Sequence, residues 1–171
     1  MFLTHITVDI SEQNTVICYQ RKNSLYKYIR RRKKKMTDQN CIFCKILAGE
    51  IPSAVVYEDE DFKVILDVGP AAKGHMLILP KEHYADIMAM PEELTAKAFI
   101  LAKKMATKME SVLGCDGINV VQNNHEAAGQ TVFHFHIHLI PRMKHDKVGV
   151  TWKPGKLTDA DKEELLNKFH K

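Results

Sequence analysis

The feature that most constrains this chain is an alternation of histidine and apolar residues at positions 132–142, Val-Phe-His-Phe-His-Ile-His-Leu-Ile-Pro-Arg. A period of two is typical of a half-buried β-strand, in which successive side chains point to opposite faces. We therefore expect His134, His136 and His138 in a row on one face. The apolar residues between and beside them are expected to enter a core: Phe133, Phe135, Ile137 and Leu139.

Three imidazoles on one face need partners, because each neutral ring carries one hydrogen-bond donor and one acceptor. A solvated face is the plain alternative, although Lys, Glu or Thr would serve it equally well. Two chemistries explain the row better. Three histidines can hold a catalytic zinc ion. Alternatively, one imidazole can attack phosphorus and form a covalent intermediate, with a neighbouring imidazolium stabilising charge. The residues alone leave both open.

Further polar groups are expected near the same end of this strand. Gly129, Gln130 and Thr131 directly precede it and supply backbone N–H groups and a hydroxyl. His75 follows a Lys-Gly pair at the start of another expected strand, which makes it a candidate fourth imidazole.

Length and composition predict one domain, since 171 residues with 45% hydrophobic content can bury a sizeable core. No apolar run approaches the roughly 18 residues of a membrane span, so no membrane partner is expected. The net charge of +4 is unevenly spread: residues 1–35 carry nine Lys or Arg against two acids. The rest of the chain is mildly acidic, so its folded domain is not expected to bind nucleic acid.

We expect three parts: an extension at 1–35, a folded domain at 36–155 and a C-terminal helix at 156–171. The extension ends in six consecutive basic residues, Arg30 to Lys35, and such a block predicts disorder. A basic arm for nucleic acid or a membrane surface is one alternative. A start-site artefact is another, because Met36 follows the block directly. A secretory signal does not fit, because the basic block follows the apolar patch.

The expected strands, besides the histidine strand, are at 54–57, 62–67, 75–80 and 117–122. A short helix is expected at 41–48, a long one between Pro91 and Gly114, and a last one from about Thr158. Because strands and helices do not alternate regularly, the pattern favours an α+β fold with a mostly antiparallel sheet.

Cys41 and Cys44 form a Cys-x-x-Cys pair with three possible roles: half of a zinc site, a redox pair, or two packed thiols. The lack of a secretory signal suggests a reducing, cytoplasmic compartment, where structural disulfides are rare. Cys18 and Cys115 have no expected partner.

The motif His134-Phe135-His136-Ile137-His138-Leu139-Ile140 resembles the signature of the histidine-triad (HIT) family, His-φ-His-φ-His-φ-φ with φ apolar. The resemblance covers about residues 39–155. Further matching stretches are Cys41-Ile42-Phe43-Cys44, Gly49-Glu50-Ile51-Pro52, Gly74-His75, Pro80-Lys81-Glu82-His83, Ala128-Gly129-Gln130-Thr131 and Trp152-x-Pro154-Gly155. The chain is most similar to the bacterial, zinc-containing branch of nucleotide-binding hydrolases.

This resemblance implies a homodimer whose subunits each have a five-stranded antiparallel sheet and two main helices. It implies that His136 is the nucleophile that attacks the α-phosphate. His138 and His75 resemble flanking phosphate-site histidines, and Thr131 resembles a hydroxyl residue that helps the leaving group depart. Thr stands where many members have Ser. The expected nucleotide-binding residues are Asp67, for the ribose, Asn123, Gln130 and Val132, for phosphate, and Ile42, Phe43, Ile46, Ile51 and Val68, for the purine.

The resemblance also implies a structural zinc ion held by two cysteines and two histidines: Cys41, Cys44, His83 and His134. Trp152 resembles an aromatic residue that approaches the partner subunit's site, and simple packing is its alternative. The implied activity is hydrolysis of purine nucleoside phosphoramidates or dinucleoside polyphosphates through a nucleotidyl-histidine. The alternative is a nucleotide-binding interaction protein with little turnover. A hydrolase with zinc on all three triad histidines is a more distant alternative.

Overall fold

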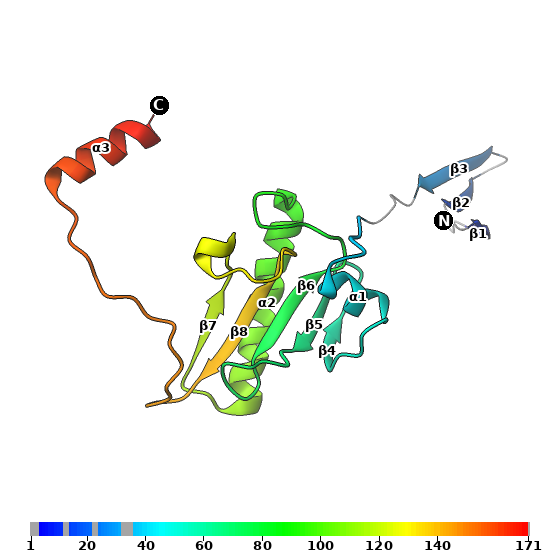
Figure 1. Cartoon of the computed structure of the whole chain (residues 1–171). Coiled ribbons are helices and arrows are strands. Elements are labelled where there is room, and N and C mark those ends of the chain that lie inside the picture. Colours follow the sequence, from blue (N-terminus) through cyan, green and yellow to red (C-terminus); the bar gives the residue numbers. More distant parts are fainter. Residues whose placement is uncertain (1–3, 12–13, 22–23, 32–35, 171) are drawn as a thin grey trace.

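The computed structural model describes residues 4–11, 14–21, 24–31 and 36–170, and a five-stranded antiparallel sheet lies at its centre (Figure 1). The strand order is β4-β5-β6-β8-β7. The strands are β4 (Val55–Glu58), β5 (Phe62–Leu66), β6 (Met76–Pro80), β7 (Gly117–Val121) and β8 (Ile137–Arg142). This confirms the expected α+β fold and its antiparallel sheet, and it places the last strand, β8, in the interior.

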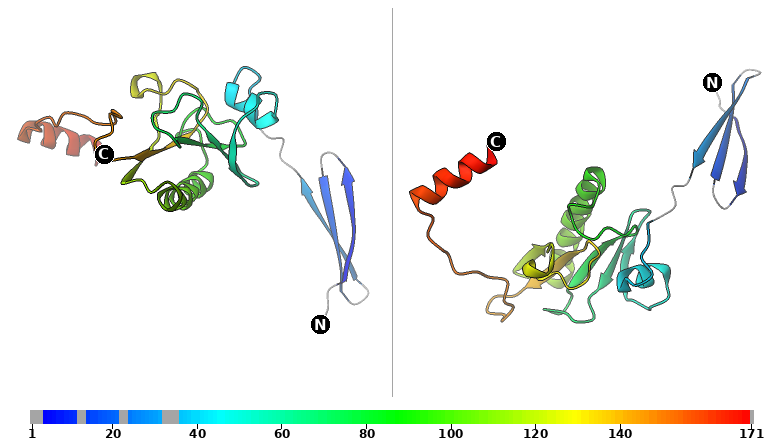
Figure 2. Two further views of the ribbon diagram at one scale, coloured as in Figure 1. Left: turned by 90° about the horizontal axis from the view of Figure 1, so that it is seen from below. Right: turned by 45° about the horizontal axis from the view of Figure 1, so that its top comes forward.

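The long helix α2 (Glu92–Leu113) covers one face of this sheet (Figure 2). Pro91 precedes its first turn and Gly114 ends it in the left-handed conformation at φ 61°, as the sequence predicted. Its apolar stripe packs on the inward side chains of the strands. The core cluster on this face includes Phe62, Val64, Ile78, Ala98, Leu101, Met105, Met109, Phe135, Ile137 and Leu139.

The opposite face carries the short helix α1 (Ile42–Ala48) and the single-turn helix η1 (Glu126–Ala128) (Figure 2). A second core cluster forms here, in which Cys41, Phe43 and Cys44 pack on side chains of β5 and β6. These are Ile65, Leu77 and Leu79. Leu77 of β6 belongs to this cluster and pairs with His138 of β8. Directly opposed residues point to the same face, so His138 shares the face of α1.

The histidine strand is shorter than predicted, because β8 begins only at Ile137. His134 and His136 therefore lie in the segment that leads into it. Its backbone bonds elsewhere: the N–H of Phe135 donates to the carbonyl of Tyr84 at 2.6 Å. Pairing of β6 with β8 stops at Ile78, two residues before Pro80, which has no N–H to continue a ladder.

Three of the four apolar residues predicted for the core are fully buried: Phe135, Ile137 and Leu139. Phe133 is 53% exposed, so its prediction is wrong. It lies outside β8, where alternation no longer follows the faces of the sheet.

The connection between β5 and β6 folds back tightly and brings its two ends together. The N–H of Asp67 donates to the carbonyl of His75 at 3.0 Å. Gly74 makes this return possible, since its φ is 94° and a Cβ built there would lie 2.6 Å from Cδ1 of Leu113.

Outside the domain, β1 (Thr4–Ser11), β2 (Asn14–Arg21) and β3 (Ser24–Arg31) form a separate antiparallel sheet. The sequence predicted disorder here, whereas these segments are rich in the β-branched and aromatic residues that favour strands. Most of the basic block, residues 32–35, lies outside the described residues. The division of the chain at residues 35 and 155 stays a prediction.

The last helix, α3 (Asp159–Phe169), stands away from the domain on an extended segment (Figure 1). Thr158 caps it through a reciprocal pair of hydrogen bonds with Asp161, which explains why the helix begins where the sequence predicted. Among the described residues, no helix is long and apolar enough to cross a bilayer.

Candidate functional site

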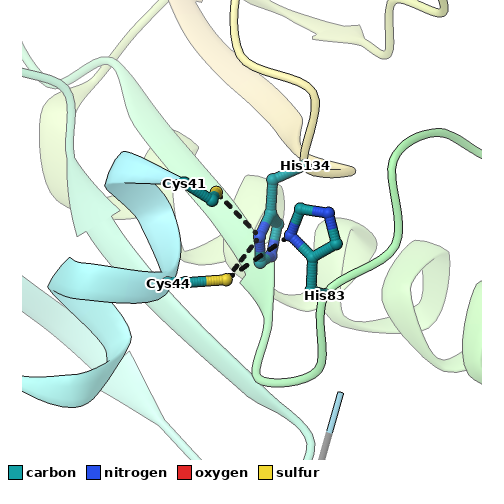
Figure 3. Close-up of side chains that lie close together, drawn as sticks. All are labelled: Cys41, Cys44, His83 and His134. Atoms are coloured by element: carbon teal, nitrogen blue, oxygen red, sulfur yellow. Dashed lines mark hydrogen bonds between the residues drawn. The ribbon is translucent and has the colours of Figure 1, made fainter. Parts of the chain in front are cut away.

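Two cysteines and two histidines from three parts of the chain converge beside α1 (Figure 3). Cys41 precedes α1, Cys44 lies in its first turn, His83 follows β6, and His134 precedes β8. The Sγ atoms of Cys41 and Cys44 lie 3.5 and 3.6 Å from Nδ1 of His134. Sγ of Cys44 lies 3.4 Å from Nδ1 of His83.

These spacings fit a tetrahedral metal site. Zinc bonds of about 2.3 Å to sulfur and 2.0–2.1 Å to nitrogen place the two ligand atoms about 3.6 Å apart. The other ring nitrogen of His134, Nε2, lies 3.0 Å from the carbonyl of Pro80. A carbonyl only accepts, so Nε2 carries the hydrogen and Nδ1 presents its lone pair to the sulfurs. The four side chains can therefore hold a metal ion. Among the described residues, no fifth ligand group belongs to this cluster.

His136 is buried next to this cluster, and its orientation is fixed by its own chain. Its Nδ1 lies 2.7 Å from the carbonyl of His134, so Nδ1 must donate and Nε2 keeps the lone pair. Burial lowers the pKa of His136 below its ordinary value, against a raising effect of that hydrogen bond. At neutral pH the ring is therefore uncharged, with Nε2 available as a nucleophile or base.

His138 and His75 form a hydrogen-bonded pair beside His136. The N–H of Ala71 donates to Nδ1 of His75 at 3.1 Å, so neutral His75 carries its hydrogen on Nε2. Nε2 of His75 then donates to Nδ1 of His138 at 2.9 Å. His138 consequently presents an N–H at its Nε2. Its ring centroid lies 4.8 Å from that of His136. The N–H donor of His138 and the lone pair of His136 therefore belong to neighbouring rings.

Burial dominates the titration of this pair as well. It lowers the pKa of His138 to about 4, with the neighbouring His136 and His75 adding to the effect. It also lowers the pKa of His75, although the carboxylate of Asp67 acts in the opposite direction. All three imidazoles are therefore neutral near pH 7 in the free protein.

Asp67 lies at the far side of His75. Its Oδ1 accepts the N–H of Gly69 at 2.8 Å, and its Oδ2 is 3.5 Å from Nδ1 of His75. Asp67, His75 and His138 are close enough to be considered a second metal cluster. However, Asp67 and His138 approach opposite nitrogens of the His75 ring, which makes a chain of polar contacts rather than a closed set around one point.

Gln130, for which the resemblance implied a phosphate contact, is bonded to backbone groups in the structure. Its side chain is 2% exposed, and all of its polar atoms bond to backbone. Oε1 accepts the N–H of His125 at 2.8 Å, and Nε2 donates to the carbonyls of Ala85 and Val132. Gln130 therefore holds together the loops before β8, a role that its sequence position alone did not reveal.

The remaining predicted residues differ in how far they are exposed. Thr131 is exposed, Asn123 is half-buried, and Val132 packs on the second core cluster. Ile42 is 48% and Val68 98% exposed, and Ile46 and Ile51 are half-buried. Trp152 is 85% exposed in this single chain. Their roles in nucleotide binding stay predictions.

The ring of Phe43, which the resemblance assigned to the purine site, contacts two histidines of the triad. Its ring stands edge-on to His134 at a centroid distance of 5.9 Å and to His136 at 5.2 Å. The sequence also missed the carbonyl of Pro80 and the N–H of Ala71, which set the tautomers of His134 and His75. Backbone groups have no sequence signal of their own, because every residue carries a carbonyl and every residue except proline carries an N–H.

Comparisons with known proteins agree with this site. The family model for the HIT domain matches residues 48–145. Protein hit of Bacillus subtilis is 44% identical over 130 residues, covering 75% of this chain and 89% of that protein. Adenosine 5′-monophosphoramidase HNT1 of Saccharomyces cerevisiae is 43% identical over 136 residues, covering 78% of this chain and 80% of the yeast protein.

Solved structures share the fold, and one of them is described as zinc-bound. A crystal structure from Streptococcus mutans is 38% identical with a TM-score of 0.75, covering 81% of this chain and 89% of that one. A zinc-bound histidine triad family protein from Mycobacterium smegmatis is 36% identical with a TM-score of 0.62, covering 75% and 97%. With the triad, the antiparallel sheet and the Cys₂His₂ cluster all in place, this chain belongs to the HIT family.

Proposed function

We propose that the protein hydrolyses purine nucleoside phosphoramidates or dinucleoside polyphosphates at the α-phosphate through a nucleotidyl group carried on His136. The observation that carries this proposal is the fixed tautomer of His136. Its Nδ1–H is held by the carbonyl of His134 at 2.7 Å, and burial keeps the ring neutral. Nε2 is thus a permanent lone pair, which is what attack on phosphorus requires.

In the first step, Nε2 of His136 attacks the α-phosphorus and forms a P–N bond. The bond from phosphorus to the leaving amine or phosphate breaks, and that bond's electrons leave with the departing group. The N–H at Nε2 of His138 is placed to stabilise the phosphoryl oxygens, and the hydroxyl of Thr131 is proposed to help protonate the leaving group.

In the second step, water attacks the same phosphorus. The water releases a proton to the solvent, a new P–O bond forms, and the P–N bond to His136 breaks, so that the mononucleotide is released and Nε2 regains its lone pair. Two successive displacements replace one difficult step by two easier ones.

The nucleotide itself is proposed to lie along α1 and the β5–β6 connection. Asp67 accepts hydrogen bonds from the ribose hydroxyls through Oδ2, because Oδ1 is already bonded to Gly69. The purine lies against apolar side chains that the structure leaves partly open, including Ile42 and Val68. Asn123 and the backbone at Val132 are proposed to contact phosphate.

We also propose that Cys41, Cys44, His83 and His134 bind zinc. The sulfur–nitrogen spacings of 3.4 to 3.6 Å and the tautomer of His134 support this. Because all four positions are protein ligands, the zinc ion would contribute structure and would have no open position for water. A cytoplasmic location would keep both thiols reduced.

A homodimer is proposed to form through the outer edge of β7. Within the described residues this edge pairs with no strand, and Val120 on β7 is an apolar side chain that is 46% exposed. The other edge strand, β4, is protected by a bulge between Val55 and Tyr57 and by the charge of Glu58.

The experiment that tests the function compares hydrolysis of adenosine 5′-phosphoramidate and diadenosine tetraphosphate by wild type and His136→Ala. We expect AMP from at least one substrate, and a loss of about 10⁴-fold or more in His136→Ala with AMP binding retained. His145→Ala, in an exposed loop, is the matched control and should keep full activity. Nucleotide binding without His136-dependent turnover would reject the hydrolase and favour a nucleotide-binding interaction protein.

A further inference from the structure

We propose that metal bound by Cys41, Cys44, His83 and His134 positions the nucleophile, so that metal occupancy sets the rate of nucleotidyl transfer to His136. A zinc site that contributed only folding energy would leave this rate unchanged in molecules that stay folded. The inference rests on the proposed function, because it concerns the same reacting nitrogen.

One residue belongs to both parts of the site. The imidazole of His134 faces the sulfurs through Nδ1 and the carbonyl of Pro80 through Nε2, at 3.5 and 3.0 Å. The backbone carbonyl of this residue is the acceptor that fixes Nδ1–H of His136 at 2.7 Å. Anchoring the side chain of His134 therefore fixes the carbonyl that orients the nucleophile, with no intervening residue.

A second connection runs through α1. Phe43 lies between the two cysteines in the sequence, and its ring contacts both His134 and His136 edge-on. The position of Phe43 depends on where Cys41 and Cys44 are held. The metal ligands thus restrain the ring of His136 from two sides, through its hydrogen-bond acceptor and through a packed aromatic ring.

The segments that meet here lie outside the strands of the sheet: His134 precedes β8, His83 follows β6, and α1 packs on the sheet. The backbone hydrogen bond from Phe135 to Tyr84 links the first two segments, but it does not reach the ligand side chains. Metal bonds define ligand positions far more narrowly than sulfur–nitrogen contacts between neutral groups. Since a misplacement of 1 Å can cost about 10²-fold in rate, small movements of the His134 carbonyl are sufficient to slow the reaction.

The test uses His83, the ligand that lies outside both the triad and α1. His83→Ala removes a metal ligand and one ring contact to His134, and it leaves the residues of the triad and of α1 unsubstituted. His83→Cys is the matched variant, because a Cys₃His set also binds zinc. Each purified full-length protein is measured for bound zinc, the single-turnover rate of His136 adenylation at saturating adenosine phosphoramidate, the Kd for AMP, and amide hydrogen exchange in residues 132–138.

For His83→Ala we expect loss of zinc, adenylation slower by about 10²-fold, faster exchange in 132–138 and little change in the AMP Kd. His83→Cys should restore zinc and most of the rate. The proposal is overturned if His83→Ala loses zinc but adenylates His136 at the wild-type rate. It is equally overturned if the rate falls only in proportion to an unfolded fraction measured by circular dichroism. Failure of wild type itself to adenylate His136 would instead reject the proposed function.

Discussion

Each of the four histidines has a different hydrogen-bond partner. The partner determines which of the two ring nitrogens carries the hydrogen. His134 donates to a carbonyl and turns its lone pair to the cysteines. His136 donates to a carbonyl and turns its lone pair away from its own chain. His75 accepts a backbone N–H and donates to His138. Tautomer, rather than residue type, therefore separates the proposed metal ligand, the proposed nucleophile and a hydrogen-bond donor.

Burial of His138 predicts a measurable pH dependence of stability. Its pKa is about 4 in the folded protein, below the ordinary 6.5, so only the unfolded chain binds this proton between those pH values. The free energy of unfolding should therefore fall as the pH is lowered through this window, by up to about 2 kcal/mol between pH 7.5 and pH 5.

Urea denaturation of wild type and His138→Asn at the two pH values measures this contribution. The loss on acidification should be smaller in His138→Asn, which has no ionisable group there. His145→Asn, on an exposed loop, should retain the wild-type loss. An equal loss in all three proteins would contradict the argument.

The residues predicted which histidines gather at the site, and the resemblance implied a role for each, but neither predicted the hydrogen bonds that set their tautomers. The spacing of His134, His136 and His138 marked the motif, and the Cys-x-x-Cys pair marked half of the metal cluster. The carbonyl of Pro80 is 54 residues from His134 in the sequence, whereas the N–H of Ala71 is four residues from His75. Both contacts depend on how the backbone folds. For the same reason Gln130 was expected at the phosphate, whereas its amide is fully occupied by backbone partners.

At the scale of elements, the sequence predicted the helices whose ends are determined by neighbouring residues. Pro91 and Gly114 bound α2, and Thr158 caps α3, as their chemistry requires. The start of β8 depends instead on when β6 stops pairing with it, which periodicity cannot reveal. The histidine alternation therefore predicted a strand that begins several residues too early.

The packing of α2 gives a prediction about its two faces. Met109 is 1% exposed against the sheet, whereas Val112, one turn later, is 68% exposed. Met109→Ala should lower the free energy of unfolding by about 2–5 kcal/mol, through lost burial and the cavity left behind. Val112→Ala should change it by no more than about 0.5 kcal/mol. Chemical denaturation compares them, and similar effects of both substitutions would show that the helix packs differently.

At the scale of the whole molecule, the proposed dimer predicts that the two sheet edges behave differently. Sedimentation of wild type should give the mass of two chains. Val120→Asp, on β7, should yield monomers, because a charge at the centre of an edge strand opposes pairing. Val55→Asp, on β4 and similarly exposed, should stay dimeric. A monomeric wild type would contradict the proposed dimer. Dissociation by the β4 substitution alone would place the dimer interface elsewhere.

The proposed mechanism requires a covalent bond between His136 and the nucleotide, and the most direct measurement is to isolate this adduct. Wild type is mixed with adenosine 5′-phosphoramidate for milliseconds, quenched in alkaline denaturant to preserve the P–N bond, and digested for mass spectrometry. We predict an adenylyl group on the peptide containing His136, formed before steady-state release of AMP and absent in His136→Ala. Release of AMP with no adduct, or an adduct that persists in His136→Ala, would contradict the mechanism.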